Sequence, residues 1–531
     1  MQKETINRRA THFFTSTAND LVYNQEKFVA FIHQPFSKEA FTRQLLEKEN
    51  NYSLSHRRVL VDTLEKDYES VSINQKTKKQ LSLLSEESTF TVTTGHQLNL
   101  YTGPLYFIYK IFHVIKLAEE LKHLHPDKHF IPVYWMASED HDFEEIKQIT
   151  LFDEKYSWNT NQKGAVGSFN LDDFDDFKNS LSKRFENDDT LQALIQSNYK
   201  DTDTLSKATF RLVHELFSDY GLIIIDANKR ALKTLFSTVM EKELKSQFSN
   251  DAVIKTTEKL VDLGYKAQVT PRAINLFYID DNNHRERIIF DENENFLIGD
   301  QKKTLSQLLK ELKYTPEKFS PNVVLRPVYQ EFILPNLAYV GGGGEITYWL
   351  QLKGVFDAVN LTYPLIQVRN SIQLFDKNII KKLNKLNIAT KAIFDDIHQL
   401  KKTFVIQESK EELDFSELES VGEQLSRQME DLVATVDKGL VGYGKSEASK
   451  IQKQVNQLKQ KMIRHQKKKF DDTLSQIDAV YTKLFPDNTL QERKENMLEW
   501  MAKIGKEEYM SVLYRTIEPF EKDLIILKDQ T

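Results

Sequence analysis

Two short segments combine polar and ionisable side chains at places where the sequence predicts the end of a β-strand. The first is Thr94-Gly95-His96-Gln97, which follows the β-prone run of residues 89–94. Glycine permits a tight turn and a close approach of a ligand to the backbone, and a neighbouring histidine can donate a hydrogen bond to an oxyanion or a phosphate. The alternative is structural: the histidine would hydrogen-bond a carbonyl of a nearby loop.

The second segment is Glu139-Asp140-His141-Asp142, which follows the apolar run of residues 130–137. Such a group can bind a cation, ribose hydroxyls or an amine, and mutual repulsion can raise the pKa of one carboxyl toward that of a general base. Alternatively, the acids form the solvated first turn of a helix. We expect no metal site, because adjacent residues point in different directions and the segment contains no His-x-x-x-His pair.

A third segment, residues 320–352, contains an arginine and a run of four glycines. Arg326 can hold a carboxylate or phosphate through two parallel hydrogen bonds. The glycines precede a helix-like stretch, residues 346–352, so their amides can face an anion at a helix N-terminus; a flexible linker fits poorly between two apolar segments. The predicted substrate- and anion-binding residues here are Arg326, Gln330, Asn336, Gly341, Gly342, Gly343, Gly344 and Glu345.

The elements that position these segments follow the order of a βαβ unit. A strand over residues 89–94 leads into a helix that starts near Pro104, the apolar strand of residues 130–137 follows, and another buried strand is expected at residues 221–226. Ligands of parallel sheets bind beyond the carboxyl ends of the strands, where the first two segments fall. The sequence therefore predicts an α/β fold with a Rossmann-type parallel-sheet core.

Four regions are predicted along the 531 residues. Residues 1–88 form a helical N-terminal layer of the core. Residues 89–375 form the Rossmann-like core, with subdomains inserted at about 150–220 and 228–318. Residues 376–485 form a helical coiled-coil arm, and residues 486–531 pack back on the core.

The arm is predicted from apolar residues at three- and four-residue spacing on both sides of a turn near residues 439–444, a pattern typical of a long antiparallel hairpin. The predicted seam is Leu418, Val421, Leu425, Met429, Leu432, Val436, Ile451, Val455, Leu458 and Met462. Residues 439–446, from Gly439 to Ser446, also match the letters of a phosphate-binding P-loop. A P-loop needs a preceding strand, so we predict the tip of the hairpin here.

Composition argues against several classes of protein. Lys and Arg total 72 against 78 Asp and Glu, a formal charge of -6, whereas nucleic-acid-binding proteins usually carry a basic excess, so no nucleic-acid partner is expected. The absence of cysteine excludes disulfides, cysteine-ligated zinc and a thiol nucleophile of the protein's own. With no signal-like start and no apolar stretch of about 20 residues, we expect a cytoplasmic protein without membrane contact.

Three motifs, in this order, resemble the bacillithiol biosynthesis cysteine-adding enzyme family, BshC: Thr94 to Pro104, Pro132 to Asp142, and Leu325 to Glu345. The resemblance implies a Rossmann-type core related to class I nucleotidyl-transferring synthetases and a homodimer formed through the coiled-coil arm. It also implies a ligase that adds L-cysteine to the glucosamine amine of glucosaminyl-malate, the last step of bacillithiol biosynthesis. Forming an amide in water is uphill, so the carboxylate would be activated, with ATP and Mg²⁺ as the expected reactants.

The resemblance also implies roles for the candidate residues. The stretch ending in Gly95-His96 is similar to the [TH]-x-G-H element of class I nucleotidyltransferases, whose histidine stabilises charge on phosphates. Arg326 and the glycines would hold an anionic group. The expected catalytic residues are His96, Gln97, Asp140, His141 and Asp142, with Thr94, Gly95 and Glu139 as adjoining substrate-binding residues. Among them, the acids would orient the amine or accept its proton, with His141 as the alternative base.

One departure from the synthetase pattern bears on the use of ATP. No loop resembles Lys-Met-Ser-Lys-Ser, and the nearest string, residues 445–450, lies in the arm. Two other functions stay open at this point. One is a Rossmann-type nucleotidyltransferase that makes no amide, and the other is a non-enzymatic scaffold in which the coiled-coil arm recruits partners.

Overall fold

In the computed structural model, which describes residues 1–291, 295–409 and 414–529, five parallel strands form the central sheet in the order β13-β12-β2-β3-β6. They are β2 (Thr89–His96), β3 (His129–Met136), β6 (Ile223–Asp226), β12 (Asn336–Gly341) and β13 (Leu365–Val368). These strands are buried along nearly their whole length, as in parallel sheets covered on both faces. The predicted Rossmann-type core is confirmed.

The strand order reverses beside β2. The chain runs from β2 through α5 (Tyr106–Leu124) to β3 and on to β6, whereas β12 and β13 lie on the other side of β2. Helix α5 packs against β2, β3 and β12. The carboxyl ends are in register, because His96 pairs with Met136 and Gly341 pairs with Val368. Open α/β sheets bind ligands at such a switch point.

The residues before β2 form four α-helices and one strand. Helices α1 (Ser16–Tyr23), α2 (Lys38–Asn51), α3 (Leu54–Tyr68) and α4 (Gln75–Leu83) precede β2, and α2 packs against β12 and β13. The first residues form a strand, β1 (Gln2–Ile6), which the sequence did not predict. Its partner is the C-terminal strand β15 (Leu524–Lys528), so the pairing is set by residues more than 500 positions away.

The two inserted regions differ in structure. The first contains β4 (Gln148–Leu151), β5 (Glu154–Ser157), α6 (Phe143–Ile146), α7 (Asp175–Arg184), α8 (Asp189–Asn198) and α9 (Leu205–Phe217). The second carries an antiparallel sheet in the order β10-β9-β8-β7-β11. Its elements are α10 (Arg230–Ser246), α11 (Phe248–Asp262), β7 (Leu276–Ile279), β8 (Arg285–Phe290), β9 (Phe296–Ile298), β10 (Gln301–Lys303), α12 (Leu305–Tyr314) and β11 (Phe319–Pro321).

After β11 the chain returns to the central sheet through α13 (Arg326–Ile333), and α14 (Gly343–Trp349) and α15 (Lys353–Ala358) lie between β12 and β13. A third sheet, β1-β15-β14, then joins both ends of the chain to β14 (Ile372–Phe375). A separate apolar core forms between this sheet and the helices at the base of the arm. These helices are α16 (Lys377–Lys385), α17 (Ile397–Glu408) and α20 (Asp471–Leu484).

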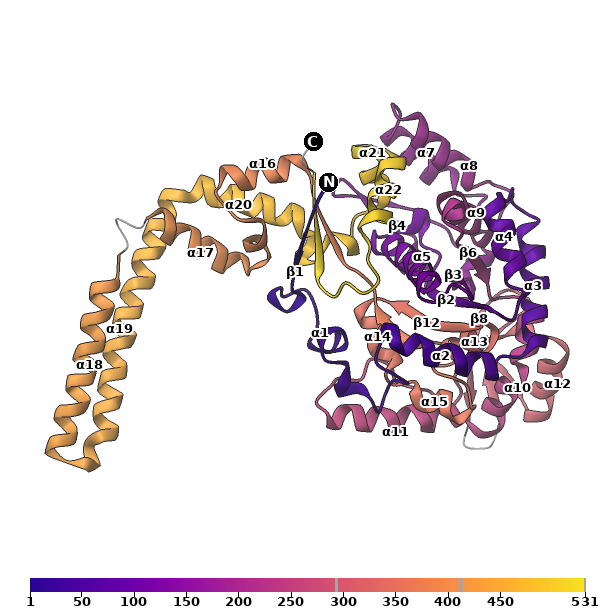
Figure 1. Cartoon of the computed structure of the whole chain (residues 1–531), viewed down its shortest axis with the longest axis horizontal. Helices are drawn as coiled ribbons and strands as arrows, with labels where there is room; N and C mark the ends of the chain where they lie inside the picture. The colour runs from indigo at the N-terminus through magenta and orange to yellow at the C-terminus, as the bar shows by residue number, and fades with distance from the viewer. Residues whose placement is uncertain (292–294, 410–413, 530–531) are drawn as a thin grey trace.

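The C-terminal segment returns to the body, as Figure 1 shows. Helix α21 (Met497–Ile504) contacts α8, and α22 (Lys506–Thr516) contacts α5. Between β14 and α21, the 3-10 turn η11 (Gln491–Arg493) contacts β14. The short turn therefore links the sheet at the base of the arm to the edge of the central sheet.

The arm projects from the body as an antiparallel pair of helices (Figure 1), α18 (Ser416–Val436) and α19 (Val441–Lys467). The turn η8 (Lys438–Leu440) connects them, so the P-loop-like string of residues 439–446 lies at the hairpin tip, with residues 441–446 forming the start of α19. Both helices carry small buried residues at their contact, where Gly422 on α18 packs against Val455 and Gly444 on α19 packs against Val433. The two helices are therefore closely spaced.

Most of the predicted apolar seam lies on the outside of the hairpin. Met429, Ile451 and Val455 are partly buried, whereas the other seam residues are exposed: Leu418, Val421, Leu425, Leu432, Val436, Leu458 and Met462. Close packing around glycine, serine and alanine turns the larger residues of both helices outward. The arm therefore presents apolar side chains to its surroundings.

None of the helices in the described residues is both long and apolar enough to cross a membrane.

Candidate active site

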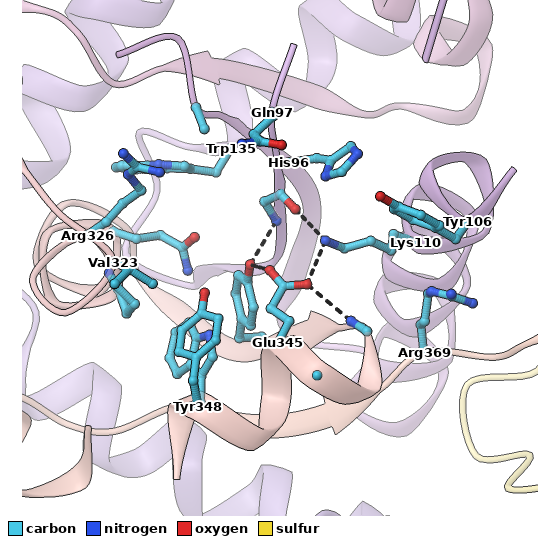
Figure 2. Close-up of a pocket in the computed structure, with 18 of the residues that line it drawn as sticks. His96, Gln97, Tyr106, Lys110, Trp135, Val323, Arg326, Glu345, Tyr348 and Arg369 are labelled. Carbon is cyan, nitrogen blue, oxygen red and sulfur yellow. Dashed lines mark hydrogen bonds and ion pairs between the residues drawn. The ribbon is translucent and has the colours of Figure 1, made fainter. Parts of the chain in front are cut away.

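A cavity of about 620 Å³ opens at the carboxyl ends of β2, β3 and β12, beside the switch in strand order (Figure 2). Its wall comes from residues 95–140, residues 323–349 and Arg369 of the core, and from Arg493 of the C-terminal segment. The lining residues are Gly95, His96, Gln97, Tyr106, Lys110, Trp135, Ala137, Asp140, Val323, Arg326, Pro327, Gln330, Tyr339, Gly342, Gly343, Gly344, Glu345, Tyr348, Trp349, Arg369 and Arg493. All three predicted segments reach this cavity.

His96 is the last residue of β2, and its ring packs beside Tyr106 and Phe107 at centroid distances of 5.3 and 5.4 Å. Its buried Nε2 has no hydrogen-bond partner among the described residues, so the structural alternative of a bond to a loop carbonyl finds no support. Burial, followed by the charges of Lys110 and Arg369, holds the pKa of His96 well below its usual range. The imidazole is therefore neutral near pH 7, and its Nε2 is a buried polar atom without a partner in the wall of the cavity.

Lys110 and Glu345 form an ion pair at the side of the cavity opposite Trp135 in Figure 2, with a distance of 2.8 Å between Nζ and Oε2. Lys110 also donates to the carbonyl of Gly95, and Glu345 accepts hydrogen bonds from the hydroxyl of Tyr339 and the amide of Gly342. Burial lowers the pKa of Lys110, while Glu345 opposes that shift. The pair ties the end of β2 to α5 and the start of α14.

This arrangement corrects the expectation for the glycine segment. Gly342, Gly343 and Gly344 line the cavity, but the Gly342 amide already bonds the Glu345 carboxylate at 3.1 Å. Gly341 lies outside the lining, and a Cβ there would come within 2.9 Å of the Glu345 carboxylate and of Ile346. Close packing therefore explains the glycine at position 341. The Gly342 amide, which was expected to bind a ligand, donates its hydrogen bond to Glu345 instead.

On the opposite wall, Asp140 forms two parallel hydrogen bonds with Arg326, of 2.9 Å from Nη1 and 2.6 Å from Nη2. Arg285 lies 3.8 Å from the same carboxylate. Burial by itself raises the pKa of Asp140, but Arg326 and then Arg285 lower it below its ordinary value. Asp140 is therefore ionised near pH 7 and is a weak proton acceptor.

The other three residues of the acidic segment do not line the cavity. Glu139 is buried in an ion pair with Lys233 of α10. His141 and Asp142 are exposed, and Nδ1 of His141 accepts a hydrogen bond of 3.0 Å from Arg285. The expectation that these three contact substrate or act as the base is not supported by their positions, because Arg285 and Lys233 engage two of them from the inserted region.

Several other predicted residues are used to hold the site together. Thr94 donates to the carbonyl of Val340 at 2.7 Å and lies outside the cavity lining. Asn336 is fully buried, where it accepts from Thr93 at 2.8 Å and donates to Glu331, so it contacts strands rather than a ligand. Two predicted glutamines do line the cavity, and the side-chain amide of each donates a hydrogen bond of 2.9 Å to a glutamate: Gln97 to Glu145 and Gln330 to Glu331.

Sequence reasoning missed most of the aromatic and cationic lining residues: Tyr106, Lys110, Trp135, Tyr339, Tyr348, Arg369 and Arg493. For one of them, Lys110, the sequence does contain a signal. Lys110 is the single charged residue between residues 105 and 115, in an otherwise apolar helix, and a lysine in such a run indicates a buried cation with a partner. The partner, Glu345, could not be read from the sequence.

Arg369 follows β13 and forms a buried, two-bonded ion pair with Glu492, with both N–O distances at 2.8 Å. Its guanidinium lies 5.3 Å from the centre of the Tyr106 ring. Glu492 belongs to η11, and the next residue, Arg493, also lines the cavity. The C-terminal segment thus fixes one cation of the cavity and supplies another.

Within residues 1–291, 295–409 and 414–529, no three histidine or acidic side chains are grouped so as to hold a metal ion. Both carboxylates that line the cavity are already paired with cations. The described side chains therefore offer no ready ligand set for a resident metal.

Two family models match nearly the whole chain. Residues 1–370 match the family described as "Bacillithiol biosynthesis BshC, N-terminal Rossmann-like domain", and residues 372–528 match "Bacillithiol biosynthesis BshC, C-terminal coiled-coil domain". A protein of Flavobacterium johnsoniae named "Putative cysteine ligase BshC" is 40% identical over 99% of this chain and 100% of its own length. Proteins of the same name from Flavobacterium psychrophilum and Christiangramia forsetii are 38% and 37% identical, each over 99% of this chain and over 100% and 99% of their own lengths.

Proposed function

Because the chain belongs to the bacillithiol biosynthesis BshC family of cysteine ligases, we propose that it joins the carboxyl group of L-cysteine to the amine of glucosaminyl-malate. We propose further that ATP activates the carboxylate before the amine attacks. The observation that carries the proposal is the neutral, unpartnered imidazole of His96 at the end of β2, in the cavity at the switch point of the sheet.

The chemistry of amide formation supports the use of ATP. A carboxylate and an amine do not condense in water without activation, and a phosphate or adenylate leaving group is the usual means. The position of Gly95-His96 at a strand end is similar to the [TH]-x-G-H element of nucleotidyltransferases. Mg²⁺ would then enter with the nucleotide phosphates.

His96 can stabilise the negative charge that develops during such a reaction. A neutral imidazole donates a hydrogen bond without carrying its own charge, and a donor fixed in a water-poor site costs no reorganisation when the charge appears. The wall formed by Tyr106 and Phe107 holds the ring in place. The nearby ammonium of Lys110 adds a fixed positive charge, although Glu345 partly offsets it.

Asp140 fits a role in orienting the amine better than a role as the base. Arg326 keeps the carboxylate ionised and fixed, and an ionised carboxylate in the cavity can accept a hydrogen bond from an amine. Its lowered pKa makes it a weak proton acceptor. His141, the alternative base expected from the sequence, is exposed and outside the lining.

The test is mass spectrometry of the full chain incubated with L-cysteine and glucosaminyl-malate, with and without ATP and Mg²⁺. Expected is an amide product that requires ATP and falls at least 100-fold in rate in His96→Ala, the scale of losing one charge-stabilising donor. His398→Ala, an exposed histidine on α17, is the matched control and should react like the unaltered protein. Product without ATP would contradict the activation step, and no product with all reactants present would contradict the substrate assignment.

We also propose that the protein is a homodimer formed through the arm. The support is the set of exposed apolar side chains on α18 and α19, which a second copy of the same arm would cover.

A further inference from the structure

Four cationic side chains line the cavity in the described part of the chain, and three of them have carboxylate partners. Lys110 pairs with Glu345, Arg326 pairs with Asp140, and Arg369 pairs with Glu492. Those three charges are therefore largely compensated before any substrate binds.

Arg493 is different. Its side chain is exposed, and no carboxylate among residues 1–291, 295–409 and 414–529 forms an ion pair with its guanidinium. The neighbouring Lys494 is paired with Asp487 at 2.9 Å and does not line the cavity. Arg493 thus provides the uncompensated positive charge at the cavity.

The backbone that carries Arg493 is held firmly from both sides. The Gln491 side chain accepts a hydrogen bond of 3.0 Å from the amide of Leu374, and Glu492 bonds Arg369 and is 1% exposed. The Arg493 amide donates to the carbonyl of Leu490 at 3.0 Å. The fold therefore fixes the start of a side chain whose charged end stays free, which is the arrangement expected of a ligand-binding cation.

We propose that Arg493 binds a carboxylate of the malate group of the amine substrate, and that the C-terminal domain in this way selects that substrate. This inference rests on the proposed function. The reacting amine has to lie inside the cavity near His96 and Asp140, so the malate group, which does not react, extends toward an edge. An exposed guanidinium suits a group with two negative charges, because the carboxylates keep part of their hydration while one of them is bound through two hydrogen bonds.

The experiment measures binding to the full chain by calorimetry, with glucosaminyl-malate, with methyl α-glucosaminide, which lacks both carboxylates, and with ATP-Mg²⁺. Arg493→Gln should weaken binding of glucosaminyl-malate by about tenfold or more, the scale of a lost charge-assisted hydrogen bond. Arg493→Lys should retain part of the affinity, because it keeps the charge but not the planar fork. Neither variant should change the affinity for methyl α-glucosaminide or ATP-Mg²⁺.

Lys494→Gln is the matched control, since it removes one positive charge at the next position of the chain, from a side chain that does not line the cavity. It should bind all three ligands like the unaltered protein. Equal affinity of Arg493→Gln and the unaltered protein for glucosaminyl-malate would overturn the inference, as would a loss confined to ATP-Mg²⁺. Failure of the unaltered protein to bind glucosaminyl-malate would instead overturn the proposed function, so the two failures are distinguishable.

Discussion

Asp140, just beyond the end of β3, and Arg326, at the start of α13, join two walls of the cavity through a pair of parallel hydrogen bonds of 2.9 and 2.6 Å. The two residues are 186 positions apart in the chain. Each side chain is mostly buried, with 15% of Asp140 and 20% of Arg326 exposed. Their pairing both shapes the cavity and keeps the Asp140 carboxylate ionised.

Asp140→Asn should lower the free energy of unfolding by about 3 kcal/mol, because it leaves the Arg326 guanidinium without its counter-charge in a mostly buried place. Urea unfolding followed by circular dichroism measures this loss. Arg427→Gln on the arm is the control, because its ion pair with Glu423 is highly exposed, and it should change stability by less than about 0.5 kcal/mol. Equal small losses in both variants would show that the Asp140–Arg326 pair contributes little.

Lys110→Met should also destabilise the protein, by about 3 kcal/mol, since it leaves the Glu345 carboxylate without its cation. The double variant Lys110→Met with Glu345→Gln should lose less than the sum of the two single variants, because residues in direct contact are not additive. Lys450→Met, which breaks an exposed pair with Glu447, is the control and should be nearly neutral. Strict additivity in urea unfolding would argue that the two residues do not interact in solution.

His113, on α5 behind the cavity, should make the protein less stable in acid. Burial lowers the pKa of His113 to about 3, and its Nδ1 accepts a hydrogen bond of 3.2 Å from the amide of Asn370. His113 of the unfolded chain is protonated below about pH 6.5, whereas His113 of the folded chain stays neutral down to about pH 3. The neutral, buried His113 therefore contributes its full amount to the free energy of unfolding above about pH 6.5. That contribution is lost as the pH falls toward about 3. Between pH 7.5 and pH 5 the expected loss from this residue is about 2 kcal/mol.

The measurement compares urea unfolding at the two pH values for the unaltered protein and for His113→Asn. Asparagine retains an acceptor for the Asn370 amide but does not titrate. The variant should lose about 2 kcal/mol less on acidification, and groups such as His96 that titrate in both proteins cancel from the difference. An unchanged pH dependence would mean that His113 is already protonated, or free to become so, in the folded state.

The outward-facing apolar residues of the arm should hold two copies together. Light scattering should give twice the chain mass for the unaltered protein and the monomer mass for a variant carrying Leu425→Asp and Leu432→Asp, because a charge inside an apolar interface is costly. Gln424→Asp, an exposed polar position on the same helix, is the control and should remain dimeric. A monomeric unaltered protein at micromolar concentration would contradict the homodimer.

The sequence alone determined the parts of the structure that depend on neighbouring residues. Apolar runs that end in Gly95-His96 and near Asp140 predicted β2 and β3 and the edge of the sheet where a ligand would bind. The P-loop-like string was assigned correctly to a hairpin tip because a helix, not a strand, precedes it. In both cases the deciding information lies within a few tens of residues.

Only the tertiary structure decided which polar residues face the cavity. Glu139 and Asp140 are adjacent, yet one is buried against Lys233 while the other lines the cavity beside Arg326, and both partners come from distant segments. Lys110, Arg369 and Arg493 meet at one cavity from a core helix, the end of a strand and a C-terminal turn. In the arm, close packing around small residues turned most of the predicted seam outward. The physical reason is common to all three: a charge or an apolar side chain is placed by the partner that compensates or covers it, and such partners are brought near only when the chain folds.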